Sequence, residues 1–187
     1  MPTVEVHYYD RAGEENTDDV LRLASRRGQE LRIGQVVVAS SHGMTGLKAR
    51  RAFADSVEVI AVTISAAFSR EGWVISEEER HTLAQAGVKV LTAMHSLGDD
   101  ISEAMVGEGS APNRIVRETL YRFSQGMKVA VEVAIMAAEA GMLDMSADAI
   151  AIGGTDNGAD TAIVLKPVYA RDFARLKIRE ILAMPRS

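Results

Sequence analysis

The sequence predicts a three-layer α/β/α fold, built on a mostly parallel, doubly wound sheet. Five short runs rich in β-branched and other apolar residues recur along the chain, and patterns typical of helices separate most of them. Val36, Val37 and Val38 are apolar at consecutive positions, as in a parallel strand that is covered on both faces. The predicted strands are Gln35–Ala39, Val57–Thr63, Val88–Thr92, Ala149–Ile152 and Ala162–Leu165.

Helix start signals support the predicted helices. Thr17 is the expected N-cap of the first helix, because Asp18 and Asp19 follow it and complement the helix dipole. Ser76 and Glu79 have the spacing of a capping box at the start of the third helix. The predicted helices are Thr17 to about Gly28 or Leu31, Met44–Ala54, Ser76–Ala86, Pro112–Phe123 and Gly126–Ala140.

Extended segments are predicted near both ends of the sequence. Val4–Tyr9 combines aromatic residues with alternating polarity. Lys177–Met184 alternates roughly, so we expect it to form an extra strand at an edge of the sheet. There is neither an internal repeat nor a linker, and residues 1–187 are therefore expected to form a single domain.

The composition excludes several classes of function. The net charge of −5 argues against a nucleic-acid-binding surface, which requires a basic stripe. The chain contains no cysteine, which excludes disulfides, thiolate catalysis and cysteine zinc sites. Its first residues lack the basic start and apolar block of a signal peptide, and its most apolar helix is short and contains two glutamates. We therefore expect a soluble cytoplasmic protein that binds neither nucleic acid nor a membrane.

Small polar residues follow the first predicted strand. Hydroxyls and free backbone N–H groups at the start of a helix can bind an anion, and glycine permits a positive φ or a close approach of a ligand. The alternative is that the hydroxyls only cap the helix that follows. The motif matches neither G-x-G-x-x-G nor a Walker loop. These residues are Ser40, Ser41, His42, Gly43, Met44 and Thr45.

A glycine-rich segment follows the fourth predicted strand. Gly153 and Gly154 leave room for a ligand at the carboxyl end of the strand, next to Thr155. The alternative is a glycine-rich hairpin in which Asp160 accepts hydrogen bonds from loop amides. The intervening residues 156 and 157 are interpreted as turn residues.

Three further positions have two possible roles each. His95 follows the third predicted strand, where a histidine can act as an acid or base near neutral pH or can simply bond to its loop. Lys128 and Glu132 stand four apart on an apolar helix, so they can pair, or Glu132 can reach a loop amide. The four histidines do not have the spacing of metal ligands, and we predict no metal site.

Six stretches of the sequence resemble a known family. They are G-E-E-N-T (13–17), V-V-V-A-S-S-H-G-M-T-G-L-K-A (36–49), F-S-R-E-G (68–72), V-E-V-A-I-M-A-A-E-A-G (131–141), G-G-T-D-N-G-A-D-T-A (153–162) and E-I-L-A-M-P-R (180–186). The second stretch resembles the C-terminal α/β domain of pyruvate kinase. The match is closer with small, largely uncharacterised prokaryotic proteins that are built on that domain alone.

The resemblance implies strand order 3-2-1-4-5 with an antiparallel last strand. The segments after the first and fourth strands, with Thr63 at the end of the second, would then meet where the strand order reverses. The family also implies a phosphorylated ligand, and a mononucleotide such as flavin mononucleotide (FMN) is one candidate. This chain has Ile64-Ser65-Ala66-Ala67 where the family has Tyr-His-Thr-Gly, so one polar contact of the family's site is missing.

From these observations we expect a protein that binds a phosphate-bearing small molecule and has no pyruvate kinase activity. The phosphate is expected on Ser40, Ser41, Gly43 and Thr45. The alternative is a small enzyme acting on a phosphorylated metabolite, with His95 as acid or base and Asp160 as its partner. A third interpretation is a scaffold whose loops only cap helices. We also expect a homo-oligomer, because the related domain makes subunit contacts in pyruvate kinase and an edge strand offers unpaired backbone groups.

Overall fold

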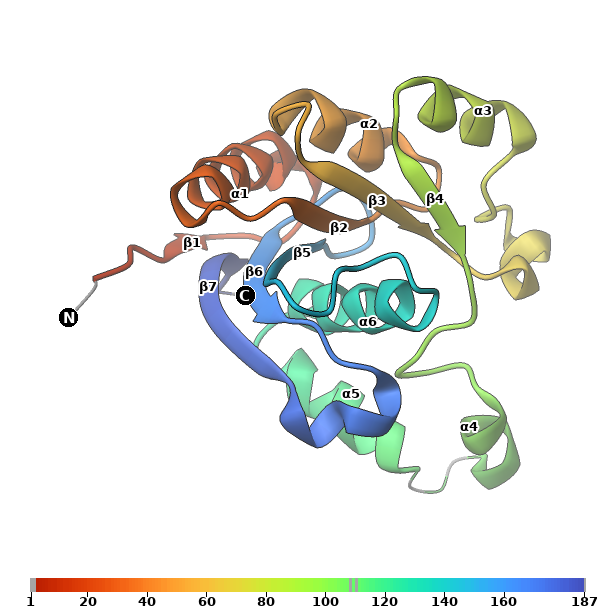
Figure 1. The fold of residues 1–187 in the computed structure, drawn as a ribbon. Helices are drawn as coiled ribbons and strands as arrows, with labels where there is room; N and C mark the ends of the chain where they lie inside the picture. Colours follow the sequence, from red (N-terminus) through yellow and green to blue (C-terminus); the bar gives the residue numbers. More distant parts are fainter. Residues whose placement is uncertain (1–2, 108, 110, 187) are drawn as a thin grey trace.

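A seven-stranded mixed sheet is the middle layer of the computed structural model, which describes residues 3–107, 109 and 111–186 (Figure 1). Its strands lie in the order β1-β7-β6-β5-β2-β3-β4. Their bounds are β1 His7–Tyr9, β2 Gln35–Ala39, β3 Glu58–Thr63, β4 Lys89–Thr92, β5 Ala149–Gly153, β6 Thr161–Lys166 and β7 Lys177–Pro185.

The predicted fold class and strand order are confirmed. The five predicted strands are β2 to β6, and they lie in the order β4-β3-β2-β5-β6. Neighbours are parallel from β4 to β5, and β6 is antiparallel to β5. The order reverses between β2 and β5, which are adjacent in the sheet although more than a hundred residues separate them in the chain.

One strand prediction is wrong in its position. Lys177–Met184 does form a strand, β7, but it is not at the edge of the sheet. The N-terminal segment adds β1 in parallel beside its last residues, with His7 opposite Ala183 and Tyr9 opposite Pro185. The edge strands of the described sheet are therefore β1 and β4.

Helices cover both faces of the sheet. α1 (Thr17–Leu31), α2 (Met44–Ala52) and α3 (Glu77–Gln85) lie on one face, while α5 (Pro112–Tyr121) and α6 (Gln125–Glu139) lie on the other (Figure 1). The short α4 (Ile101–Val106) precedes α5, and three 3-10 helices complete the described part: η1 Glu14–Asn16, η2 Ala66–Glu71 and η3 Ala170–Arg175. None of the described helices has the length and apolar character needed to cross a bilayer.

The consecutive apolar residues of β2 are explained by two separate cores. Val36 and Val38 are fully buried in the cluster beneath α1, α2 and α3, and Val37 is fully buried in the cluster beneath α6. Successive side chains of a strand point to opposite faces, so a strand between two helical layers is apolar at every position.

Of the two predicted helix caps, one is confirmed and one is wrong. The Ser76 hydroxyl accepts from the Glu79 amide and the Glu79 carboxylate accepts from the Ser76 amide, which is the predicted capping box. Thr17 is the first helical residue of α1, so Asn16, and not Thr17, is the N-cap. The Thr17 hydroxyl donates to the Glu14 carbonyl (2.7 Å) and accepts from the Ala159 amide (2.9 Å), and it thereby joins α1 to the β5–β6 loop.

Candidate functional site

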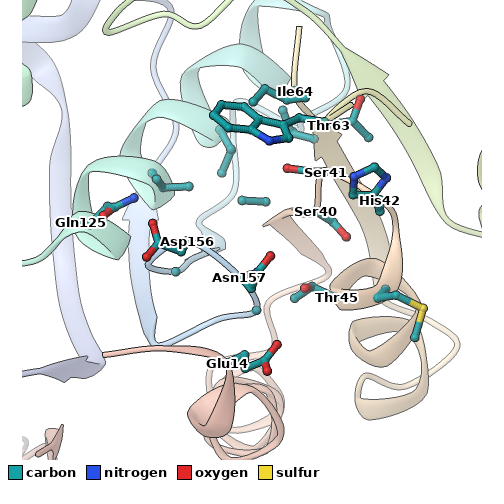
Figure 2. A pocket seen from close by; sticks show the side chains of 18 of the residues that line it. Glu14, Ser40, Ser41, His42, Thr45, Thr63, Ile64, Gln125, Asp156 and Asn157 are labelled. Atoms are coloured by element: carbon teal, nitrogen blue, oxygen red, sulfur yellow. The ribbon is translucent and has the colours of Figure 1, made fainter. Parts of the chain in front are cut away.

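A large cavity lies where the strand order of the sheet reverses. Its volume is about 970 Å³, and it is lined by residues that follow β2, β3, β4 and β5, together with η1 and the inner side of α6. Figure 2 shows Ser40, Ser41 and Thr45 on one side of the cavity, Gln125 and Asp156 on the other, and Glu14 below. A crevice beyond the carboxyl ends of the strands is the usual ligand site of an open α/β sheet.

The turn between β2 and α2 forms one wall of the cavity. Gly43 is the N-cap of α2 and has a left-handed backbone with φ 83°. A side chain here would also come within 2.8 Å of Leu83, so glycine is required for the turn itself. The Ser40 hydroxyl accepts from the Gly46 amide at 3.0 Å and therefore satisfies one of the donors at the start of the helix.

Several donors of this turn remain available. The amides of Met44 and Thr45 are the first two of α2, and such amides have no acceptor within their helix. In residues 3–107, 109 and 111–186, no hydrogen bond is made by the backbone amide or hydroxyl of Ser41 or by the Thr45 hydroxyl. Both side chains line the cavity (Figure 2). His42 and Met44 line it too, and Met44 is largely exposed.

Thr63 lies at the end of β3, but its hydroxyl contacts the neighbouring strand. Its hydroxyl is 2.5 Å from the Thr92 hydroxyl and 3.3 Å from the Leu91 carbonyl oxygen, and the side chain is buried. The next residue, Ile64, presents an apolar side chain to the cavity. The Ser65 hydroxyl caps η2 by accepting from the Ala67 amide. Of the described residues 64–67, Ile64 therefore adds an apolar side chain to the cavity wall.

The two glycines after β5 allow neighbouring backbone segments to pack closely against them. A side-chain carbon at Gly153 would lie 2.7 Å from the Ala130 amide nitrogen of α6, and one at Gly154 would lie 2.9 Å from the Ala159 Cα. Gly154 lines the cavity, whereas neither Gly153 nor Thr155 is among the described lining residues. Asp156 and Asn157 line it instead, although the sequence alone marks them only as turn residues.

Asp160 and His95 are not hydrogen-bonded to each other in the described chain, so Asp160 is not the partner of His95 that the enzyme alternative required. Asp160 is fully buried, and its carboxylate accepts from the Gly13 amide (3.2 Å), the Thr155 amide (3.0 Å) and the Thr161 hydroxyl (2.8 Å). These contacts correspond to the alternative interpretation, in which Asp160 binds loop amides.

His95 has a nearer carboxylate as its partner. Its Nδ1 lies 2.9 Å from Oδ2 of Asp99, four residues further along the same loop. Asp99 has a left-handed backbone with φ 56°, an uncommon conformation for a residue other than glycine. The His95 ring also contacts Phe68, whose ring stacks on Trp73. All four side chains line the cavity.

Lys128 and Glu132 are buried on the side of α6 that faces the cavity. The Lys128 Nζ donates to Oε2 of Glu132 at 2.6 Å, and the other oxygen of Glu132 accepts from the Leu97 amide at 2.9 Å. Both contacts that the sequence offered as alternatives are therefore present. The Leu97 contact attaches the loop of His95 to α6.

The cavity wall carries more carboxylates than cations. Lys48 is paired with Asp18 and Lys128 with Glu132, while His42 lies 3.3 Å from a carboxylate oxygen of Glu79. The pKa of Glu79 is lowered, first by the Ser76 amide that it accepts from, and further by the Ser76 hydroxyl and by His42. The carboxylates that line the cavity are Glu14, Glu15, Asp18, Asp99, Glu132 and Asp156. An anionic group is therefore best accommodated at the α2 turn, where amides and hydroxyls converge.

Comparison with solved structures gives distant similarities. A pyruvate kinase from Cryptosporidium parvum matches with a TM-score of 0.41 and 11% sequence identity, over 81% of this chain and 23% of that chain. A structure titled as a pyruvate kinase of this organism in complex with ADP matches with a TM-score of 0.38 and 14% identity, over the same shares. This chain thus spans about a quarter of the length of these enzymes. No model of a known protein family matches the sequence.

Proposed function

We propose that this protein binds a phosphate-bearing small molecule, with the phosphate on the turn that begins α2. The observation that carries the proposal is the set of unpaired donors at this turn: the amides of Ser41, Met44 and Thr45, and the hydroxyls of Ser41 and Thr45. Amides at a helix start, together with the positive end of the helix dipole, favour a bound anion.

One hydroxyl at this turn caps α2 and two others have no partner in the described chain, which supports a bound ligand over capping alone. One hydroxyl is enough to cap a helix start, and Ser40 already accepts from the Gly46 amide. Ser41 and Thr45 are therefore additional to the cap, and both face the cavity. A protein whose loops served only to cap helices would not need them.

The residues around the cavity suit a mononucleotide such as FMN. The turn offers donors to a phosphate, Glu14, Asp156 and Asn157 offer acceptors to sugar or ribityl hydroxyls, and Phe68 and Trp73 offer aromatic surface. The cavity volume falls in the range of small-molecule sites. When bound, FMN supplies a redox-active ring, and the protein residues hold and orient it.

We also propose that the chain is related to the small proteins built on the C-terminal domain of pyruvate kinase. The six sequence stretches and the strand order β4-β3-β2-β5-β6 support this relationship. Pyruvate kinase activity is not expected, because the described chain forms one open sheet and no (β/α)₈ barrel.

Thr45→Val tests the phosphate site, because it removes the hydroxyl and keeps the shape of the side chain. A hydrogen bond to a charged group contributes about 1.5–3 kcal/mol, so FMN affinity should fall about ten- to a hundredfold. Riboflavin, which lacks the phosphate, should bind the variant and the parent alike. Calorimetric titration with both compounds measures the difference.

Thr82→Val is the matched control. Thr82 is an exposed residue of α3 whose hydroxyl donates to the Glu78 carbonyl, and it does not line the cavity. This variant should bind FMN and riboflavin as the parent does. Equal losses for both compounds in Thr45→Val, or no loss for either, would contradict the phosphate assignment.

A second candidate function is acid–base catalysis on the bound ligand by His95. Because a carboxylate only accepts hydrogen bonds, the Asp99 contact keeps the proton on Nδ1 and leaves Nε2 to take or give a proton. Incubation of the parent and a His95→Asn variant with phosphorylated metabolites, followed by mass spectrometry, tests this function. A product formed equally by both proteins argues against it.

A further inference from the structure

Lys128 is a buried cation in the wall of the cavity. Only 7% of the residue is exposed, and its partner Glu132 is 3% exposed. Removing two charges from water costs several kcal/mol per ion, and a buried pair is often no more stabilising than two apolar side chains. The position of this pair in a cavity wall therefore indicates a role beyond the stability of the fold.

The ammonium of Lys128 retains free hydrogen-bonding capacity. A lysine has three N–H donors, and in the described chain the hydrogen bond from Nζ is to Glu132 alone. The Glu132 carboxylate is itself fixed by the Leu97 amide, which holds the ammonium near the loop that follows β4. Lys128 is on α6, which covers the face of the sheet opposite to α2 (Figure 1). Lys128 and the proposed phosphate site therefore lie on different walls of the cavity.

The charge around Lys128 limits the group that it can bind. Glu132 already neutralises the ammonium, and Glu14, Glu15 and Asp156 face the same cavity without a lysine or arginine partner in the described chain. A second anionic group on the ligand would meet a net negative surface. An uncharged oxygen, in contrast, can accept a hydrogen bond from Nζ without an added charge.

We propose that Lys128 is a specificity-determining residue that donates to an uncharged carbonyl or amide oxygen of the ligand, at the end opposite its phosphate. This inference rests on the proposed function. It assigns the ligand to the phosphate monoesters of neutral, carbonyl-bearing molecules and separates it from phosphorylated acids and bisphosphates.

The test must separate binding by Lys128 from its structural pairing with Glu132. Lys128→Met alone leaves a buried carboxylate without its partner and should lower the melting temperature. The double variant Lys128→Met/Glu132→Gln has no buried charge and keeps an oxygen for the Leu97 amide, so its melting temperature should be closer to that of the parent. Its affinity for a ligand then reports on the ammonium.

FMN and riboflavin are the first probes, because both have ring carbonyls and only FMN has a phosphate. The double variant should bind both compounds about ten- to a hundredfold more weakly than the parent, since both lose the same hydrogen bond. Parent-like affinity of the double variant for both compounds would overturn the role of Lys128 and leave the phosphate site intact. A parent that binds neither compound would overturn both proposals.

Failure of the phosphate proposal has a different signature. In that case the parent binds FMN and riboflavin equally, and Thr45→Val changes neither affinity.

Uridine and orotidine 5′-monophosphate, which differ by one carboxylate, test the requirement for an uncharged end of the ligand. We expect tighter binding of uridine monophosphate. Equal or tighter binding of orotidine monophosphate, or no binding of either, contradicts the assigned ligand class.

Discussion

Three hydroxyls within six residues differ in their partners at the start of α2. Ser40 bonds to the Gly46 amide inside the protein, while Ser41 and Thr45 have no partner in the described chain. Sequence pattern alone does not separate these roles, because Ser and Thr suit a helix cap and an anion site equally well. The separation depends on the left-handed turn at Gly43, which brings the Ser40 oxygen under the third amide of the helix.

Ser40→Ala is expected to lower the stability of the protein by about 1 kcal/mol, because the Gly46 amide loses its acceptor in a buried position. Urea denaturation of the parent and the variant measures this change. Ser65→Ala is a suitable control, since its hydroxyl caps η2 in an exposed loop. A free energy of unfolding equal to that of the parent would show that the Ser40 bond does not cap α2.

The partner of His95 illustrates a second limit of sequence reasoning at this scale. Asp160 and Asp99 both follow predicted strands, and the strand order alone brings the loop of Asp160 near the site. Asp160 is instead bound by two amides and a hydroxyl, and the local residue Asp99 contacts His95. A contact four residues away depends on the backbone conformation of the loop, which hydrophobic periodicity does not determine.

At the scale of elements, segments with an apolar period or a helix-start signal were predictable, including the largely exposed α3 and α5, and the short α4 was not. The central strands and α6 were identified by apolar patterns, because each is covered on most sides by the protein. α4 was missed, since it is six residues long and has no buried residue. The edge position of β7 was wrong because it pairs with β1, whose residues are 176 positions away from their partners in β7.

The residues that line the cavity were also predictable only in part. The segments after β2 and β5 could be assigned to the point where the strand order reverses, once that order was known. Glu14 and Gln125 line the same cavity, but they begin a 3-10 helix and α6, and no motif in the sequence marks them as site residues. They reach the site only through the packing of these elements against the sheet.

The contact between α1 and β7 gives a prediction of pH dependence. Arg27 donates to both oxygens of Glu180, at 2.8 Å each, and these hydrogen bonds lower the pKa of Glu180. Because the pKa of Glu180 is lower in the folded state, its charge stabilises the protein at pH values above the ordinary glutamate pKa of about 4.3. This stabilisation is lost as the pH falls through the folded-state pKa of Glu180. Glu180→Gln should therefore be less stable than the parent at pH 7, and the difference should shrink below pH 4.

Denaturant unfolding at pH 7 and at pH 3 measures this convergence. Glu71→Gln, at an exposed position of η2, is the control and should change stability little at either pH. A deficit of Glu180→Gln that is equally large at both pH values would show that the charge of Glu180 is not the source of the stabilisation.

At the scale of the whole molecule, the sheet order assembles the site from distant parts of the chain. The lining residues begin at Glu14 and end at Gly158, and they come from both sides of the sheet. A cavity assembled in this way should make ligand binding depend on the folded domain as a whole. The two proposals place the phosphate and the uncharged end of the ligand on opposite helical layers, α2 on one face and α6 on the other (Figure 1).

Apolar side chains on α4 and α5 are the basis of a prediction about assembly. Glu103 of α4 forms ion pairs with Arg114 and Arg117 of α5, so the two helices are adjacent. Ile101 is 76% exposed and Met105 is 80% exposed. Exposed apolar residues grouped on neighbouring elements are typical of surfaces that bind another protein. Together with the resemblance to a domain that makes subunit contacts, they support the expectation of a homo-oligomer.

Light scattering at micromolar concentration tests this expectation and should give a multiple of the 20.2 kDa chain mass. Met105→Glu should shift the protein toward the monomer, because it would bury a carboxylate in the interface at a cost of several kcal/mol. Glu71→Gln, away from these helices, should keep the parent's mass. A parent that is monomeric at tens of micromolar contradicts the prediction, and an oligomer that Met105→Glu leaves intact assigns the interface to another surface.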